Sequence, residues 1–287
     1  MLLSGKARLA GVMGWPVGHS LSPRLHGHWF ERYRIDGTYV PLPVRPEDVA
    51  LAFQALPRLG FLGWNVTVPH KEAAFRLVDE HDPAAARIGA VNTVLVQPDG
   101  RLLGLNTDGA GFLAHLRATA PSWTPAAGPV ALLGAGGAAR GIAVALLEAG
   151  VPSLRLTNRT PERAAALAEE LARLGRGVEL LPWAAREGAF LEGAALLVNA
   201  TSLGMAGQPP LELSLTVLPR AAVVADIVYV PLETALLRAA RRRGHVAVDG
   251  LGMLLHQAVP GFSHWGGVVP VVDEALRAAV LAGLAGG

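Results

Sequence analysis

A strand-like stretch with two polar residues ends just before one of the chain's two lysines. Residues 65–71 read Asn-Val-Thr-Val-Pro-His-Lys, and Lys6 is the only other lysine. On an extended strand, Asn65 and Thr67 lie on one face and the two valines on the other. Proline cannot continue a central strand, so we expect the strand to end there and Lys71 to follow it.

Lys71 is a candidate for acid–base chemistry because it is expected just past the end of a strand with two polar residues on one face. A lysine ammonium changes its charge in response to its surroundings, whereas an arginine stays charged. The alternative interpretation is a surface lysine that opens a helix.

Two serines precede a predicted helix near the start of the chain. Ser20 and Ser22 stand two residues apart, and Pro23 follows. Both hydroxyls are expected on one face of an entering strand, where they and the helix N-terminus could hold a carboxylate. Ser22 is also a good N-cap and Pro23 a good first helical residue, so capping by Ser22 alone is the other interpretation.

Asparagine is rare in this chain, and every asparagine has a threonine within the next two residues. The five are Asn65, Asn92, Asn106, Asn158 and Asn199. This scarcity suggests that asparagine stands only where a directed amide hydrogen bond is needed.

A glycine-rich turn follows an uninterrupted apolar strand at residues 130–133. The turn reads Gly134-Ala135-Gly136-Gly137-Ala138-Ala139, and an amphipathic helix then runs to Gly150. Strand, turn and helix in this order are typical of a dinucleotide site, with Ala139 in the third glycine position. Such glycines let the backbone approach a pyrophosphate, which the helix N-terminus binds.

The next strand, at residues 153–157, ends where a dinucleotide site binds the adenosine ribose. An NAD site places Asp or Glu here, whereas this chain has Asn158, Arg159, Thr160 and Arg163. Two guanidinium groups and a hydroxyl suit a 2′-phosphate. The sequence therefore predicts NADP as the cofactor.

Composition excludes several classes of protein. The 287 residues have a formal net charge of +2 and no cysteine. We find no basic stripe for nucleic acid, no metal-ligand spacing among the histidines, no signal peptide and no membrane span. We expect a cytoplasmic protein with a small-molecule substrate and no metal, and both monomer and homodimer remain open.

Strands and helices alternate along the chain, which predicts an α/β fold. We expect strands over residues 7–14, 37–44, 61–68, 91–96, 101–107, 130–133, 153–157, 178–181, 194–200, 221–228 and 246–248. We expect helices that include residues 25–33, 47–56, 70–78, 83–88, 109–118, 161–174, 232–243 and 271–284, with another starting after Asp249. Residues 91–96 and 101–107 should form a hairpin across Pro98-Asp99-Gly100.

Nine motifs, in order, resemble those of the shikimate dehydrogenase family. They are His-Ser-Leu-Ser-Pro at 19–23, Asn-Val-Thr-Val-Pro-His-Lys at 65–71, Gly-Ala-Val-Asn-Thr at 89–93, Asn-Thr-Asp at 106–108, Gly-Ala-Gly-Gly-Ala at 134–138, Asn-Arg-Thr at 158–160, Asn-Ala-Thr-Ser at 199–202, Asp-x-x-Tyr-x-Pro at 226–231 and Gly-x-x-Met-Leu-x-x-Gln at 250–257. The resemblance covers nearly the whole chain. Two positions depart from the usual family pattern, Gly27 after His26 and the stretch before Gly89, which lacks an acidic residue.

The resemblance implies a discontinuous N-terminal α/β substrate domain plus a Rossmann-type, doubly wound NADP-binding domain. The substrate domain would comprise residues 1–108 and 251–287, and the NADP domain residues 109–250, with the active site in the cleft between them. The implied activity is reversible, NADPH-dependent reduction of 3-dehydroshikimate to shikimate in chorismate and aromatic amino-acid biosynthesis. A quinate/shikimate dehydrogenase and a non-catalytic NADP-binding regulatory paralogue are the alternatives.

The resemblance also assigns roles to residues. Ser20 and Ser22 would hold the substrate carboxylate, and Lys71 and Asp108 would form the catalytic pair. The expected ring-binding residues are Asn65, Thr67, Asn92, Gln257 and, from the other domain, Tyr229. The expected cofactor-binding residues are Gly134, Ala135, Gly136, Gly137, Ala138, Asn158, Arg159, Thr160, Arg163, Thr201, Ile227, Gly250 and Met253.

Ketone reduction needs a hydride and a proton for the oxygen that becomes negative. A protonated Lys71 can stabilise that oxygen and donate the proton, and neutral Lys71 can take it back in the oxidation. An adjacent Asp108 would hold the ammonium in place and favour its charged form.

Overall fold

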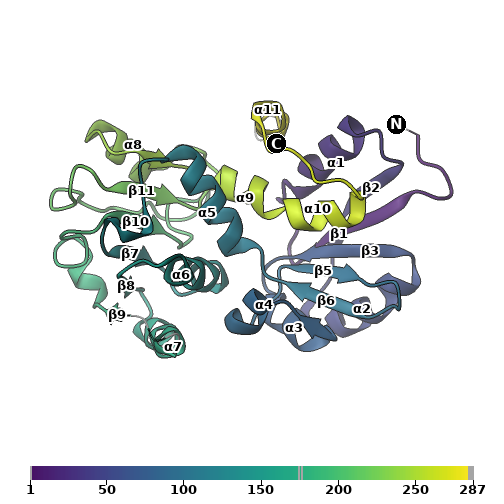
Figure 1. The fold of residues 1–287 in the computed structure, drawn as a ribbon, viewed down its shortest axis with the longest axis horizontal. Coiled ribbons are helices and arrows are strands. Elements are labelled where there is room, and N and C mark those ends of the chain that lie inside the picture. The colour runs from purple at the N-terminus through teal and green to yellow at the C-terminus, as the bar shows by residue number, and fades with distance from the viewer. Residues whose placement is uncertain (1, 174, 176, 284–287) are drawn as a thin grey trace. The chain divides into compact units, whose positions relative to one another are not determined.

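The computed structural model describes residues 2–173, 175 and 177–283 and divides the chain into two units. The first unit comprises Met1–Thr107 with Leu254–Gly287, and the second comprises Asp108–Met253 (Figure 1). The division expected from the sequence differs from this one at Asp108 and at residues 251–253. The helix ends expected at Leu174 and Leu284 lie outside the described residues.

The first unit contains a mixed six-stranded sheet with the order β2-β1-β3-β5-β6-β4. Its strands are β1 (Arg8–Gly14), β2 (Gly37–Pro43), β3 (Phe61–Val66), β4 (Glu80–His81), β5 (Thr93–Val96) and β6 (Leu102–Leu105). β1 pairs in parallel with both β2 and β3, whereas β3, β5 and β6 pair antiparallel, with β5 and β6 forming the expected hairpin.

Helices cover both faces of this sheet (Figure 1). They are α1 (Ser22–Arg32), α2 (Val49–Arg58), α3 (Lys71–Leu77), α4 (Pro83–Ile88) and α10 (Val259–Gly266), and α11 (Glu274–Leu281) packs on α1. On the α2 and α3 side, Met13, Phe53 and Trp64 are buried in one apolar cluster. On the α1 and α10 side, Trp29 packs on Phe262 with ring centroids 5.0 Å apart. Alternation along the strands thus gives each face its own core.

The strand that leads to Lys71 is shorter than expected. β3 ends at Val66, two residues before the expected end, and Val68 is 70% exposed, so the two valines do not share a strand face as predicted. The backbone N–H of Thr67 still donates to the Met13 carbonyl at 2.8 Å, but the Thr67 carbonyl accepts from His70 N–H at 2.9 Å. That turn directs the Val68 side chain into solvent.

The start of α1 also differs from the expected one. The helix begins at Ser22, and Leu21 occupies the N-cap position without a side-chain capping bond. The serines therefore do not lie on a strand, and Ser22 is not the cap. Ser20 accepts a hydrogen bond at Oγ from Ser22 N–H at 3.3 Å, which satisfies one N–H at the helix start.

The second unit contains a parallel six-stranded sheet with the order β12-β11-β10-β7-β8-β9. Its strands are β7 (Val130–Leu133), β8 (Ser153–Thr157), β9 (Gly177–Leu180), β10 (Leu196–Asn199), β11 (Val223–Asp226) and β12 (Ala247–Val248). Its helices are α5 (Asp108–Thr119), α6 (Gly137–Ala149), α7 (Pro161–Ala172) and α8 (Ala235–Arg242), and α9 (Gly250–Gln257) begins in this unit and ends in the first. Strand order reverses between β7 and β10, as in doubly wound sheets.

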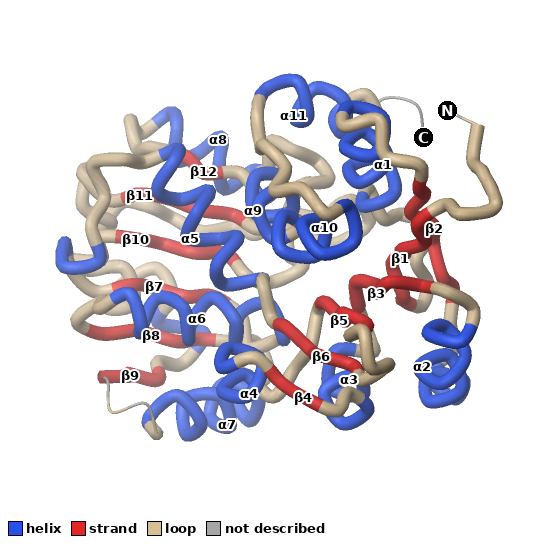
Figure 2. Tube along the Cα trace, turned by 45° about the vertical axis from the view of Figure 1, so that its right-hand side comes forward, coloured by secondary structure: helices blue, strands red, loops and turns tan. Residues whose placement is uncertain are grey.

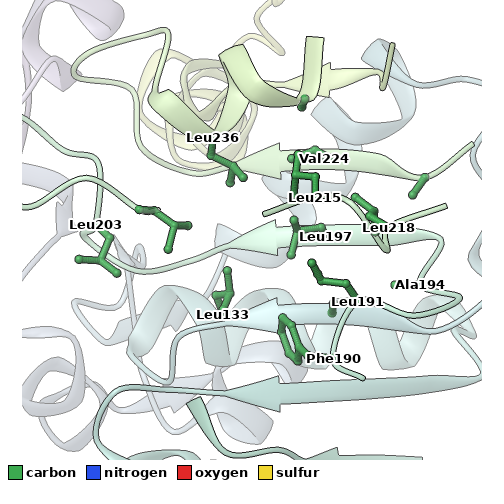
Figure 3. Packing of buried hydrophobic residues seen from close by; sticks show 14 residues of the cluster. Leu133, Phe190, Leu191, Ala194, Leu197, Leu203, Leu215, Leu218, Val224 and Leu236 are labelled. Carbon is green, nitrogen blue, oxygen red and sulfur yellow. The ribbon is translucent and has the colours of Figure 1, made fainter. Parts of the chain in front are cut away.

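Apolar side chains fill both faces of the parallel sheet. α5 and α6 pack side by side over its strands (Figure 2). On the other face, Leu133, Leu197 and Val224 from three neighbouring strands meet Phe190 and Leu215 (Figure 3). Strands buried on both sides read as continuous apolar runs, which explains the sequence of β7. No helix among the described residues is long and apolar enough to cross a membrane.

Candidate functional site

Lys71 is the first residue of α3, and its backbone is fixed from two sides. The Lys71 carbonyl accepts a hydrogen bond from Val91 N–H at 3.0 Å. The preceding residue, His70, is buried, and its Nε2 lies 2.7 Å from the Val44 carbonyl oxygen. Lys71 itself is half-buried. The turn after β3 therefore holds the lysine at the end of the sheet, as the sequence predicted.

Asp108 is the first residue of α5 and is buried, with 5% of its surface exposed. It directly follows Thr107, the last residue of the first segment of unit 1. Lys71 and Asp108 belong to different units, and their action as a pair stays a prediction.

The polar residues expected to bind a substrate ring are mostly brought together in the first unit. Asn65 Oδ1 accepts from the Tyr39 hydroxyl at 2.6 Å, and Asn65 Nδ2 donates to Thr93 Oγ1 at 2.9 Å. Asn92 Nδ2 donates to Gln257 Oε1 at 3.3 Å. All three amides thus belong to one polar cluster, in which Asn65 and Asn92 are buried and Gln257 is half-buried.

Other expected residues stand apart from that cluster. Thr67 is half-buried just beyond β3, and its hydroxyl makes no hydrogen bond within the described ranges. Tyr229 lies in the second unit, where burial raises the pKa of its hydroxyl above the ordinary value. Sequence reasoning missed Tyr39 as a member of the cluster, and it passed over Thr93 and Thr107 although they follow the asparagines of interest.

A hollow of about 490 Å³ lies elsewhere in the first unit. Its lining includes Phe53, Gln54, Arg58, Asp79 and Leu102. No residue expected to bind substrate or cofactor lines this hollow, so it has no part in the site.

The glycine turn of the second unit has the shape that a pyrophosphate needs. Gly134 has φ +114°, and a Cβ there would lie 2.7 Å from the Ala200 carbonyl oxygen. Gly136 is the exposed N-cap residue of α6, and no atom lies within 4 Å of the place where its Cβ would be. The turn is therefore tight on its inner side and open on the side where the α6 N–H groups begin, which fits an incoming phosphate.

The loop after β8 presents its cations to solvent. Arg159, Thr160 and Arg163 are exposed, and Asn158 Nδ2 donates to the Thr160 carbonyl at 2.9 Å. Neither guanidinium has a hydrogen-bond or ion-pair partner anywhere in the described part of the chain. Two unpaired arginines beside a phosphate-binding turn fit the 2′-phosphate of NADP.

Asn199 and Asp226 organise the loops that carry the remaining cofactor-binding candidates. Asn199 Oδ1 accepts from the N–H and the hydroxyl of Thr201, at 3.1 and 2.7 Å. Asp226 Oδ1 accepts from Val228 N–H at 3.0 Å, and its Oδ2 accepts from the Thr234 hydroxyl at 2.7 Å. Burial raises the pKa of Asp226 to about 6, and these hydrogen bonds oppose part of that rise.

Gly250 is packed against the loop after β11. A Cβ at Gly250 would lie 2.2 Å from the Ile227 carbonyl oxygen, so only glycine fits there. Met253, one turn further along α9, is buried with 8% of its surface exposed. Ile227, Gly250 and Met253 are thus fixed on one side of the second unit.

The turn before α6, the parallel sheet and the open arginine loop define a dinucleotide-binding α/β protein. The chain belongs to the shikimate dehydrogenase family. The family's substrate-binding domain model matches residues 12–94, and the shikimate/quinate 5-dehydrogenase model matches residues 124–185. A shikimate dehydrogenase (NADP(+)) of Paramagnetospirillum magneticum is 60% identical over 279 residues, which cover 97% of this chain and 100% of the relative.

Solved structures show the same fold. A shikimate dehydrogenase in complex with NADP+ has a TM-score of 0.90 and 34% identity, with 99% of this chain and 98% of that chain covered. The quinate dehydrogenase from Corynebacterium glutamicum in complex with NAD has a TM-score of 0.89 and 32% identity, with 96% and 99% covered. The predicted fold class is confirmed: an N-terminal substrate-binding domain and a Rossmann-like parallel sheet.

Proposed function

We propose that this protein is an NADP-dependent shikimate dehydrogenase that interconverts 3-dehydroshikimate and shikimate. The observation that carries the proposal is the hydrogen-bonded cluster of Asn65, Asn92 and Gln257 in the unit that also carries Lys71. A ring with several hydroxyls needs several fixed amide and hydroxyl groups, and a cluster of this kind offers them.

The first unit would bind and orient the substrate. Ser20 and Ser22, at the start of α1, would hold the carboxylate, because the helix N-terminus favours a negative charge. Asn65, Thr67, Asn92 and Gln257 would contact the ring hydroxyls, and Tyr229 of the second unit would complete the set. These residues therefore favour a substrate with a carboxylate and several hydroxyls on a ring.

The second unit would hold NADP through its glycine turn and its exposed arginines. Residues 134–138 would approach the pyrophosphate, and Asn158, Arg159, Thr160 and Arg163 would bind the adenosine end and its 2′-phosphate. Thr201, Ile227, Gly250 and Met253 would contact the rest of the cofactor. NADPH supplies the hydride for the reduction.

Lys71 and Asp108 would handle the proton. As hydride reaches the carbonyl carbon, negative charge develops on the oxygen, and the Lys71 ammonium would stabilise that charge and donate a proton from Nζ. In the oxidation, the neutral amine would accept the proton from the hydroxyl. Asp108 would keep the lysine oriented through both directions.

A spectrophotometric assay tests this proposal directly. The purified chain with shikimate and NADP should form NADPH, and with 3-dehydroshikimate and NADPH it should consume NADPH. No turnover in either direction would contradict the proposal and favour the non-catalytic regulatory alternative.

The fold similarity to a quinate dehydrogenase supports a second candidate, a quinate/shikimate dehydrogenase. Quinate has a hydroxyl at C1 of a saturated ring, where shikimate has a ring double bond, and both carry the carboxylate and the other three ring hydroxyls, so the same residues could accept both. Side-by-side kinetics with shikimate and quinate, each with NADP and NAD, separate the two candidates. Comparable kcat/KM for quinate and shikimate would favour the second.

A further inference from the structure

A continuous series of hydrogen bonds runs through the first unit. Its members, in order, are Tyr39, Asn65, Thr93, Asn92, Thr107 and Gln257. Three of the six are proposed substrate-binding residues, Thr93 and Thr107 link them, and Tyr39 begins the series. The directions of these hydrogen bonds decide what each member can offer to a ligand.

The amide of Asn65 can adopt only one orientation. Its Nδ2 lies 3.3 Å from the Asn92 carbonyl oxygen, which can only accept, and 2.9 Å from Thr93 Oγ1. The Asn65 amide nitrogen must therefore face the Asn92 carbonyl and Thr93, and both of its protons are used in these two hydrogen bonds. Oδ1 then faces Tyr39 at 2.6 Å. In this arrangement Asn65 can offer a ligand a lone pair but no proton.

This orientation fixes the proton of Tyr39. Because Asn65 Oδ1 can only accept, the Tyr39 hydroxyl must donate its single proton to it. The Ser22 side chain also acts on Tyr39, because it lowers the pKa of the Tyr39 hydroxyl and so opposes part of the rise that burial causes. The hydroxyl of Tyr39 thus donates to the ring-binding asparagine.

The hydrogen bonds at the Gln257 end of the series donate in the same direction. Asn92 Oδ1 accepts from Thr107 N–H at 2.9 Å, which fixes its amide, and Nδ2 donates to Thr107 Oγ1 at 3.0 Å. Thr107 Oγ1 donates to the Gln257 carbonyl at 2.8 Å, and Gln257 Nε2 donates to the Leu254 carbonyl at 3.2 Å. Every side chain from Tyr39 to Thr107 therefore donates to the next member in the same direction.

The packing around Tyr39 explains how its hydroxyl reaches Asn65. Tyr39 on β2 pairs with Ala10 on β1, and Asn65 on β3 pairs with Val12, so both side chains lie on the same face. The small Ala10 leaves room for the phenol to extend across β1. His26 stacks on the Tyr39 ring with centroids 4.0 Å apart and planes 9° apart, which holds the ring in place.

We propose that Tyr39 is a positioning residue for the substrate, whose hydroxyl fixes the Asn65 side-chain carbonyl in the arrangement that the substrate meets. This inference rests on the proposed function, because Asn65 contacts the substrate only if that function holds. It assigns Asn65 as an acceptor for a substrate hydroxyl, not as a donor.

Tyr39→Phe tests the proposal with little change in shape. The ring, its stacking on His26 and its place over Ala10 are kept, whereas Asn65 Oδ1 loses a donor. We expect KM for shikimate to rise about fivefold to thirtyfold, with kcat changed much less and KM for NADP unchanged. An unchanged KM for shikimate would overturn the proposal. An equal rise in KM for NADP would overturn it as well.

Tyr33→Phe is the matched control. Tyr33 lies in the same unit, and its hydroxyl accepts from Val271 N–H at 2.9 Å, away from the series of hydrogen bonds. If Tyr33→Phe raised KM for shikimate as much as Tyr39→Phe, a general loss of packing would explain both results and the proposal would fail.

A second measurement separates this proposal from the proposed function. In a sample labelled with ¹⁵N only at asparagine, the side-chain amide signals come from five residues. The signal absent from Asn65→Ala belongs to Asn65, and it should shift in Tyr39→Phe but not in Tyr33→Phe. Absence of that shift would overturn the positioning role, whatever the activity. If the wild type did not turn over shikimate, the proposed function would fail while the shift still supported the hydrogen bond.

Discussion

Asn199 Nδ2 donates to Asp226 Oδ1 at 2.9 Å, and this hydrogen bond joins the ends of two neighbouring strands of the parallel sheet. The two residues are directly paired in the register of β10 and β11. Both are almost completely buried, at 0% and 1% exposure. The loops with Thr201 and Ile227 therefore start from one rigid point.

Asp226 gives a pH-dependence of stability with a definite sign. Its pKa of about 6 is higher than in the unfolded chain, so the folded protein binds the extra proton between about pH 4 and pH 6. The stabilising effect of that proton is present at low pH and is lost as pH rises through 6, by roughly 3 kcal/mol in total. Asp226→Asn imitates the protonated form and should remove this contribution. Urea unfolding of both proteins from pH 4 to pH 8 measures it, and parallel curves would contradict the assignment.

His26 should act in the opposite direction. It is fully buried, and burial lowers its pKa to about 3, while neighbouring Asn65 opposes part of that change. The folded protein therefore resists protonating His26, and stability should fall as pH decreases from 6.5 towards 3, by up to roughly 5 kcal/mol. His26→Phe should unfold less steeply in acid than the wild type. The exposed His19 provides the control, because His19→Phe should leave the acid transition where it is.

Lys71→Ala tests the proposed acid–base group. We expect kcat to fall about 100-fold or more, because proton transfer then depends on water, while binding of NADP changes little. Steady-state kinetics and titration with NADP measure the two effects. Lys6→Ala, the only other lysine substitution that the chain allows, should keep full activity. Unchanged turnover in Lys71→Ala would exclude the mechanism.

Arg159 and Arg163 should decide the choice of cofactor. Replacing both with serine removes two charged donors from the 2′-phosphate, and we expect KM for NADP to rise about tenfold to a hundredfold. The kcat/KM for NAD should change little, because NAD lacks that phosphate. Arg173→Ser is a suitable control, since Arg173 is exposed just after α7 and bonds Glu169 at 3.4 Å. An equal loss with NAD would show that the arginines act on something else.

Local sequence was sufficient for the strands of the second unit. Residues 130–133 and 153–157 form β7 and β8 as predicted. Residues 130–133 are an apolar run between Pro129 and Gly134, and residues 153–157 alternate leucine with polar residues after Pro152. These patterns need no long-range information. The glycine turn was predictable for the same reason, because its φ +114° at Gly134 demands glycine.

Contacts between distant segments were not predictable in this way. β4 is only Glu80–His81, and it exists because it pairs with β6 more than twenty residues later. α10 was missed as a separate helix, because it starts at Val259 directly after the end of α9. An edge strand of two residues has no periodicity of its own, so only the folded sheet reveals it.

In the candidate site too, local contacts were predictable from the sequence and long-range contacts were not. The asparagine–threonine pairs predicted directed amide bonds, and this prediction is confirmed for Asn199 with Thr201 and for Asn158 with Thr160. Tyr39 had no such signal. Its partner Asn65 lies 26 residues away, and the two meet only because β2 and β3 both pair with β1.

The single direction of the hydrogen bonds from Tyr39 to Gln257 has a consequence for engineering. Replacing Asn65 by aspartate would set a carboxylate oxygen against the Asn92 carbonyl, two acceptors with no proton between them. A mutant library that is meant to change substrate preference therefore gains little from varying Asn65 alone. Tyr39 and Thr93 have to be randomised with it, so that donors and acceptors can reverse together.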